Sequence, residues 1–103
     1  MAGHKFDGVI EAVRYAPPGT IHTVRVYERR GAIFSDRLLL SRQALVDQLK
    51  SGKVFMAGQR MESLAGTFEV SKRVRLVKQD GKDVILSDGQ AADHDQLQGV
   101  PLF

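Results

Sequence analysis

The stretch from Thr67 to Ser87, TFEVSKRVRLVKQDGKDVILS, constrains the fold more than any other part of the chain. A long alternating run and a shorter one flank an Asp-Gly pair, which is the pattern of two antiparallel strands joined by a two-residue turn. Placing the turn at Asp80-Gly81 predicts three cross-strand pairs, which are Lys78 with Asp83, Val77 with Val84 and Leu76 with Ile85.

Strand alternation divides this hairpin into two faces. One face is predicted to join the core and carries Phe68, Val70, Val74, Leu76 and Ile85. The other face begins with polar residues and becomes apolar near the turn, in the order Glu69, Ser71, Arg73, Arg75, Val77, and across the turn Val84 and Leu86. We therefore expect only the first half of the second face to contact water.

Three strands are predicted before the hairpin, over residues 6–15, 20–30 and 32–40. A Pro-Pro-Gly turn ends the first strand, because proline presets φ and glycine accepts positive φ. The register between the second and third strands stays open. A two-residue loop would pair Tyr27 with Phe34 and Arg25 with Asp36, whereas a three-residue loop would pair Val24 with Leu38.

A short helix is predicted from Arg42 to Lys50. Ser41 is a good N-cap, Lys50 suits the negative end of the helix dipole, and Gly52 can adopt the left-handed conformation after the last turn. A short apolar strand over residues 53–57 and a loop over residues 58–66 follow before the hairpin. The helix is too short to be stable alone, so we expect it to pack on the sheet.

The predicted order of three strands, one helix, a short strand and a hairpin indicates a mainly β domain over residues 1–87. This order is typical of an OB-like, partly open small barrel, here with an extra sixth strand and one short helix. SH3-like and other small barrels, and open α+β sheets, share the order and remain alternatives. A length of 103 residues suits one domain.

Several classes of protein are disfavoured by composition. The chain has no cysteine, which excludes disulfides and thiolate zinc sites and suits a cytoplasmic protein. The N-terminus lacks an apolar leader, and the longest apolar run, at residues 38–40, is far too short to cross a bilayer. The three histidines lack ligand spacing, and no nucleophile with a base is suggested. We expect a non-enzymatic protein without a cofactor or a metal.

Positive charge is concentrated before residue 88. Residues 1–87 hold all 15 Lys and Arg but 9 of the 12 Asp and Glu, so they carry a net charge of +6. Cations and an aromatic ring share the predicted strands, namely Arg25, Tyr27, Arg29, Arg37, Lys72, Arg73 and Arg75. Guanidinium and ammonium groups bind phosphates and aromatic rings stack on bases, so this set predicts single-stranded DNA or RNA binding. The alternative is an ordinary charged solvent face.

Residues 88–103 are polar and acidic, which predicts a flexible tail. The tail ends in an apolar hook, Val100-Pro101-Leu102-Phe103, predicted to bind a protein partner. It resembles the C-terminal tail of bacterial single-stranded-DNA-binding proteins, which is acidic and closes with an aliphatic residue, proline and phenylalanine. Here Gln96 to Gly99 interrupt the acidic run and Leu102 is additional. Two competing predictions are a frayed terminus and a Leu102-Phe103 plug that packs back on the domain.

Two functions follow from these patterns. The first is single-stranded nucleic-acid binding through the basic-aromatic face. The alternative is a protein-interaction or assembly module that uses the late hairpin and the C-terminal hook. An enzyme for a small substrate would need a deep polar pocket.

Overall fold

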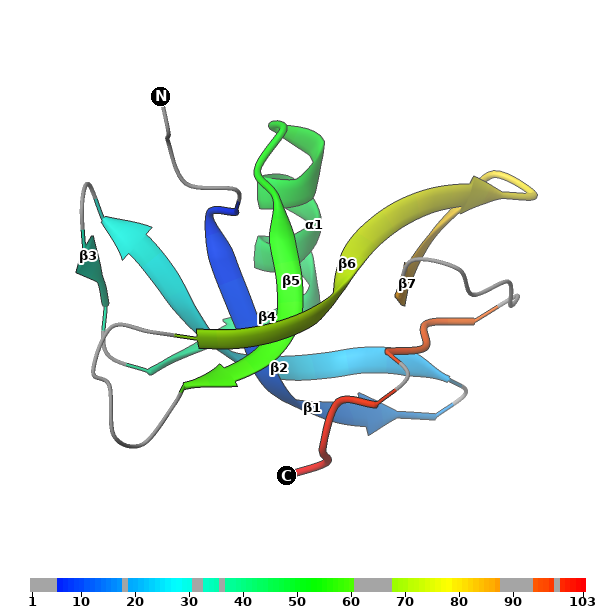
Figure 1. Cartoon of the computed structure of the whole chain (residues 1–103). Helices are drawn as coiled ribbons and strands as arrows, with labels where there is room; N and C mark the ends of the chain where they lie inside the picture. The colour runs from blue at the N-terminus through cyan, green and yellow to red at the C-terminus, as the bar shows by residue number, and fades with distance from the viewer. Residues whose placement is uncertain are drawn as a thin grey trace.

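β1 (Gly8–Ala16) lies at the centre of a seven-stranded mixed sheet in the computed structural model. The structure describes residues 6–17, 19–30, 33–35, 37–60, 68–87, 94–97 and 99–103, with the backbone alone at 30, 60, 68, 69 and 71. The other elements are β2 (Thr20–Arg30), β3 (Ile33–Phe34), β4 (Leu38–Ser41), α1 (Arg42–Lys50), β5 (Phe55–Arg60), β6 (Phe68–Gln79) and β7 (Lys82–Ser87). The sheet order is β3-β2-β1-β5-β6-β7, and β4 also pairs with β2 (Figure 1).

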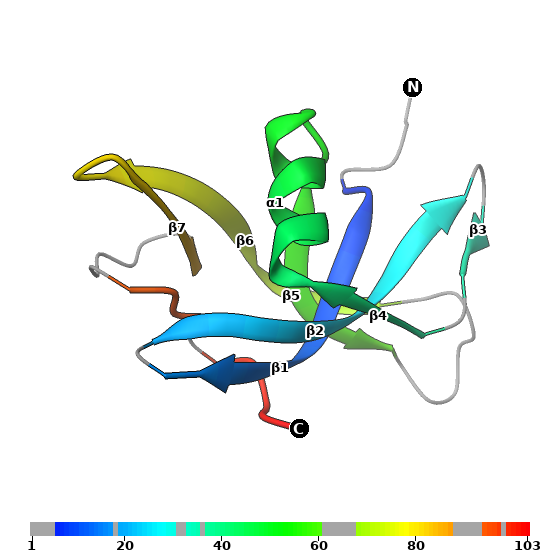
Figure 2. The same cartoon turned by 180° about the vertical axis from the view of Figure 1, so that it is seen from behind.

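The prediction of a mainly β fold with one helix is confirmed, and the elements follow the predicted order. The helix stands on one face of a strongly curved sheet (Figure 2). As described, the sheet does not close into a barrel, and the run predicted as one strand over residues 32–40 is split into β3 and β4. β5 lies parallel to β1, because the helix returns the chain to the same end of the sheet.

The late hairpin has the predicted register, with Lys78 opposite Asp83 and Leu76 opposite Ile85. Asp80 and Gly81 have φ values of 50° and 79°, as a type I′ turn requires. The predicted division of its second face also holds. Arg73 and Arg75 are exposed, whereas Val84 and Leu86 are buried. The side chains predicted at positions 68, 69 and 71 lie outside the described part of the chain.

Both predicted registers of the third strand are wrong. Arg30 lies opposite Ile33 and Val26 lies opposite Leu38, so five steps on the β3–β4 side match four steps on β2. The extra residue lies between β3 and β4, so the register with β2 differs between these two short strands. Sequence patterns cannot locate such an irregularity, since one added residue exchanges the faces without changing composition. The predicted partner Asp36 lies outside the described residues.

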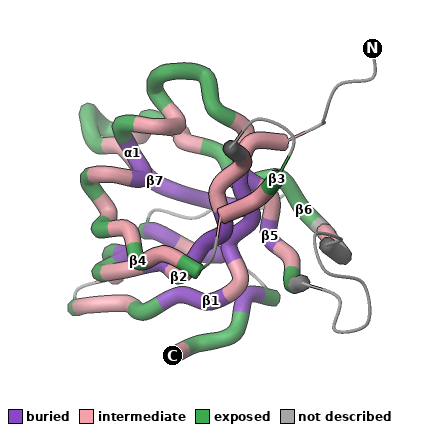
Figure 3. Tube along the Cα trace, turned by 90° about the vertical axis from the view of Figure 1, so that its left-hand side faces the viewer, coloured by how far each residue is buried: buried purple, intermediate pink, exposed green. Residues whose placement is uncertain are grey.

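The helix begins and ends as predicted. The Ser41 side-chain oxygen accepts a hydrogen bond of 3.2 Å from the Ala44 N–H, and Gly52 has a φ of 96°. Leu45 and Val46 are buried against the sheet. One apolar cluster unites the helix with the strands (Figure 3), and its members include Ile10, Val13, Val24, Val26, Leu45, Phe55, Val74, Ile85, Leu97 and Val100.

The prediction of a flexible tail is wrong for residues 94–97 and 99–103. Leu97 and Val100 are buried in the core cluster. Backbone hydrogen bonds tie the segment to the outer edge of β7 and to the part of β1 beyond its pairing with β5. The segment therefore connects the edge strand β7 with the central strand β1. Residues 88–93 and 98 of the predicted tail lie outside the described residues.

The Asp95 carboxylate anchors this segment. One oxygen, Oδ2, accepts hydrogen bonds from the Ile21 N–H at 2.7 Å and Arg42 Nε at 2.8 Å. The other, Oδ1, accepts from the Ile85 N–H at 2.9 Å and Arg42 Nη2 at 3.3 Å. The hydrogen bond to Asp95 raises the pKa of the Arg42 guanidinium, with burial opposing it. One carboxylate thus joins β2, β7 and the first residue of α1.

Gly8 is required by the close approach of β1 to Phe55. A Cβ at Gly8 would lie no more than 2.9 Å from three ring carbons of Phe55, whose side chain is fully buried. Replacing Gly8 by Ala is expected to reduce the free energy of unfolding by about 1–3 kcal/mol, the usual effect of overpacking a core. Urea unfolding followed by circular dichroism measures this loss. Adding Phe55→Leu should recover part of it, and a further decrease would contradict the steric explanation.

Candidate functional site

The arginines of β2 and β4 surround one acidic residue that the sequence did not single out. Glu11 is the additional residue of a bulge in β1, between Ile10 and Ala12. Its Oε2 lies 2.7 Å from Arg25 Nε and 2.9 Å from Arg37 Nε. Two guanidinium groups thus share one carboxylate, which leaves this group of residues with a positive charge.

Tyr27 does not supply a stacking platform. Its side chain is only 1% exposed, and its hydroxyl accepts a hydrogen bond of 2.9 Å from Arg37 Nε. This hydrogen bond and the charge of Glu11 raise the pKa of the Arg37 guanidinium. A base could not reach the Tyr27 ring, so the prediction that this residue stacks on nucleic acid is wrong. Tyr27 instead positions Arg37, which is itself exposed.

Arg29 lies apart from this group, at the end of β2 nearest β3. Its guanidinium is 4.5 Å from the centre of the Phe34 ring and 5.9 Å from that of Phe6. Its Nε also donates a hydrogen bond of 3.2 Å to the Phe6 carbonyl. Arg29 therefore links Phe6 to β3, through contacts that the sequence pattern did not predict.

The three predicted cations of β6 are exposed. Lys72, Arg73 and Arg75 project from the part of the strand that precedes the hairpin turn. Beside them lies a hollow of about 340 Å³, between β6 and the end of α1. Its lining residues are Leu49, Lys53, Arg73, Val74, Arg75 and Leu76. Lys53 is exposed and was not predicted. We call Lys53, Lys72, Arg73 and Arg75 the β6 basic surface.

The C-terminal hook lies on its own chain. Val100 is buried, and the Pro101 carbonyl accepts a hydrogen bond of 2.9 Å from the Val13 N–H. The Phe103 ring contacts two guanidinium groups, with Arg14 4.8 Å and Arg25 5.1 Å from its centre. The competing prediction of a Leu102-Phe103 plug describes the contacts of Phe103, but not the exposed Leu102.

Leu102 has 72% of its surface exposed, and Pro101 is exposed as well, although its carbonyl accepts the hydrogen bond from Val13. Capture of the whole hook by a partner would require breaking the contacts of its other three residues. The predicted partner-binding residues therefore do not form a free surface.

The sequence pattern assigned the predicted cations to strands, but it did not predict correctly which of them lie close together. Arg25 and Arg37 meet through Glu11, Arg29 lies elsewhere, and the cations of β6 form a separate surface with Lys53. The aromatic ring beside Arg25 comes from the C-terminal segment, not from β2. No local signal could have shown these groupings, since each joins distant parts of the chain.

The described part of the chain gives no support for a metal site or for a membrane-spanning helix. It contains no group of three or more His, Cys, Asp or Glu that could hold a metal ion. Within the same ranges, no helix has the length and apolar character needed to cross a bilayer.

Comparisons of the chain with protein-family models, with curated proteins and with solved structures find no match.

Proposed function

We propose that the protein binds single-stranded nucleic acid, with the phosphates on the β6 basic surface. One observation supports this function most directly, the grouping of exposed Lys53, Arg73 and Arg75 around one hollow. Phosphate contacts to Lys and Arg supply most of the affinity of sequence-independent nucleic-acid binding. The net charge of +3 favours approach of a polyanion.

The chemistry of the hollow suits a flexible strand. Arg73 and Arg75 offer planar guanidinium groups that bind phosphate oxygens in pairs, while Lys53 adds a compact charge. Leu49 and Leu76 give the same hollow an apolar part, against which a sugar or a base can rest. The exposed Arg37, which precedes β4, adds a positive charge separate from this hollow. Binding a nucleic acid on a curved sheet in this way would be OB-like. The proposal also includes a cytoplasmic location, which the absence of cysteine suggests.

Removing two cations from the β6 basic surface should weaken the salt dependence of binding. Replacing Arg73 and Arg75 together by Ala should remove two phosphate contacts. In a single strand each contact contributes about 0.7 to the slope of log affinity against log salt, so the slope should decrease by about 1.4. Fluorescence anisotropy with labelled oligonucleotides, from about 50 mM salt upward, measures this slope.

The matched control replaces Lys78 and Lys82 by Ala. Both are exposed cations of the same hairpin, near its turn and away from the hollow. We expect this control to leave the slope nearly unchanged. Equal decreases in both double variants would mean that net charge alone governs binding, and no binding of the unaltered protein at about 50 mM salt would remove the proposed function.

The alternative function, a protein-interaction module, was predicted from residues that are mostly buried within the domain. Val84 and Leu86 of the late hairpin and Val100 of the hook are buried within the chain. Leu102 alone of these four residues is exposed. We therefore favour nucleic-acid binding.

A further inference from the structure

A second cavity opens where β1 and β5 separate. The two strands pair only over Gly8–Ile10 and Phe55–Ala57 and then diverge. A cavity of about 450 Å³ lies between them, β6 and the C-terminal segment. This volume is within the usual range of small-ligand sites.

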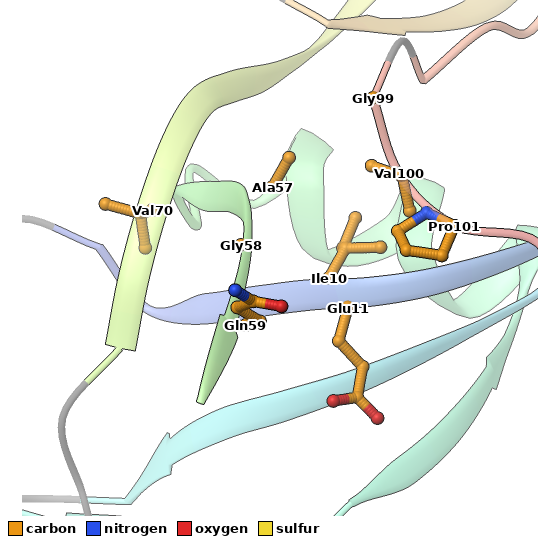
Figure 4. Close-up of a pocket in the computed structure, with 9 residues that line it drawn as sticks. All are labelled: Ile10, Glu11, Ala57, Gly58, Gln59, Val70, Gly99, Val100 and Pro101. Carbon is orange, nitrogen blue, oxygen red and sulfur yellow. The ribbon is translucent and has the colours of Figure 1, made fainter. Parts of the chain in front are cut away.

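The cavity has apolar walls and a polar edge. Val70 lies on one side and Val100 and Pro101 on the other, while Gln59 and Glu11 add polar groups, with the Glu11 carboxylate directed towards β2 (Figure 4). Bulges in β1 and β6 shape the cavity. The additional residue of β1 is Glu11. In β6 the additional residue lies between Val70 and Arg73, where three steps match two steps on β5. Bulges are common beside binding sites, where they redirect a side chain.

Glu11 has an unusual environment for a carboxylate, since its side chain is only 10% exposed. Both of its ion pairs use Oε2, and neither has hydrogen-bond geometry. This Oε2 is buried and has no hydrogen-bond donor among the described residues. Buried polar atoms without hydrogen bonds are rare in folded proteins, so a missing donor is expected here.

We propose that this cavity holds a single unstacked base that carries an exocyclic amino group, with cytosine as the first candidate. The inference rests on the proposed nucleic-acid function. The aliphatic walls would cover the two faces of a flat ring, and the Glu11 carboxylate would accept a hydrogen bond from the amino group, a contact that acidic residues make with cytosine N4. Arg25 and Arg37 already more than balance the charge of Glu11, so a neutral donor fits better than a third cation.

The cavity and the β6 basic surface belong to one strand. Val70 lines the cavity, and exposed Lys72 lies two residues further along β6, within the bulge that separates Val70 from Arg73. Arg73 follows at the edge of the hollow beside α1. A strand of nucleic acid that follows β6 could therefore place a phosphate near Lys72 while its base enters the cavity.

Uncharged nucleosides test the base site without the phosphate contribution. Cytidine and uridine differ mainly in an amino group against a carbonyl oxygen at C4, so they are closely matched probes. Titration followed by backbone amide NMR should give shifts at Gly58, Gln59 and Val100, with cytidine bound about tenfold more tightly, the lower range for a hydrogen bond to a charged group. Absence of shifts at these residues, or equal affinities, would overturn the inference.

Two variants identify the groups involved. Glu11→Gln should bring the cytidine and uridine affinities together, because the amide both donates and accepts. Val70→Phe should fill the cavity and abolish the shifts from both nucleosides, and it serves as the test if Glu11→Gln does not fold. Unchanged cytidine binding in a folded Val70→Phe protein would place the nucleoside elsewhere.

Oligonucleotides separate the two proposals. If oligo(dC) and oligo(dT) bind with equal affinity and the same salt slope, the base site is wrong and the phosphate surface stands. If cytidine shifts the cavity residues but no oligonucleotide binds at about 50 mM salt, the nucleic-acid function fails and the cavity is a nucleoside site.

Discussion

Asp95→Asn is expected to lower the free energy of unfolding by about 3 kcal/mol. Loss of one partner from a buried ion pair costs about 3–5 kcal/mol, and the 27% exposure of the Arg42 side chain favours the lower end. A small domain has roughly 5–15 kcal/mol of stability in total, so the change should be large.

The hydrogen bonds of Asp95 explain why the isosteric amide is a poor substitute. Two carboxylate oxygens accept four donors, from Arg42 and from the N–H groups of Ile21 and Ile85. Asn has one acceptor oxygen, so its NH₂ group would face donors wherever it points. At least one buried donor would lose its hydrogen bond, which costs the desolvation of that group.

Urea unfolding followed by far-UV circular dichroism measures the change. Asp80→Asn is the matched control, because it makes the same chemical change at an exposed residue whose positive φ Asn tolerates. We expect the control to stay within about 0.5 kcal/mol of the unaltered protein. Similar small changes in both variants would mean that Asp95 does not anchor the segment in solution.

Leu97→Ala is expected to reduce the free energy of unfolding by about 2–5 kcal/mol, as for other buried leucines. Leu97 is 3% exposed, belongs to the core cluster, and its N–H donates a hydrogen bond of 2.9 Å to the Tyr15 hydroxyl. Truncation to Ala would leave a cavity within the core cluster that cannot fully close.

Leu102→Ala makes the same change five residues later at a 72% exposed position and should have little effect. The same urea titration compares both variants. If residues 94–103 formed a flexible tail, the two substitutions would be equally harmless, so the difference between them tests the packing directly.

The parts of the fold that the sequence predicted well depend on local signals. Asp80-Gly81 sets the hairpin register because both residues adopt positive φ at little cost. The helix ends were also predictable, since Ser41 and Gly52 act within one turn of the residues that they cap.

The parts that were predicted wrongly depend on contacts between distant residues. Residues 94–103 appeared to be a tail because Leu97 and Val100 are separated by polar residues, and because Asp95 has no local sign of its buried partners. A lone carboxylate in an acidic segment normally stays in water. Only the geometry of β2, β7 and α1 makes burial of this one favourable.

The candidate site was partly predictable for the same reason. Alternation along β6 gave the exposed positions of Arg73 and Arg75 correctly. The bulge that turns Glu11 towards Arg25 and Arg37 was not visible, because a bulge adds a residue without a distinctive sequence. Lys53 was missed since it follows the helix and reaches the surface only through tertiary packing.

The anchoring of the C-terminal segment has a consequence for how the chain folds. Its hydrogen bonds to Ile21, Tyr15 and Arg14 join residues 74, 82 and 89 positions apart in the sequence. Contacts across such loops form slowly, because the entropy of closing the loop is lost before the contact stabilises anything. The late hairpin and helix can form early from local signals, whereas the core is complete only when Asp95 and Leu97 arrive. Search time, more than the strength of any one contact, should therefore limit the folding rate of this small domain.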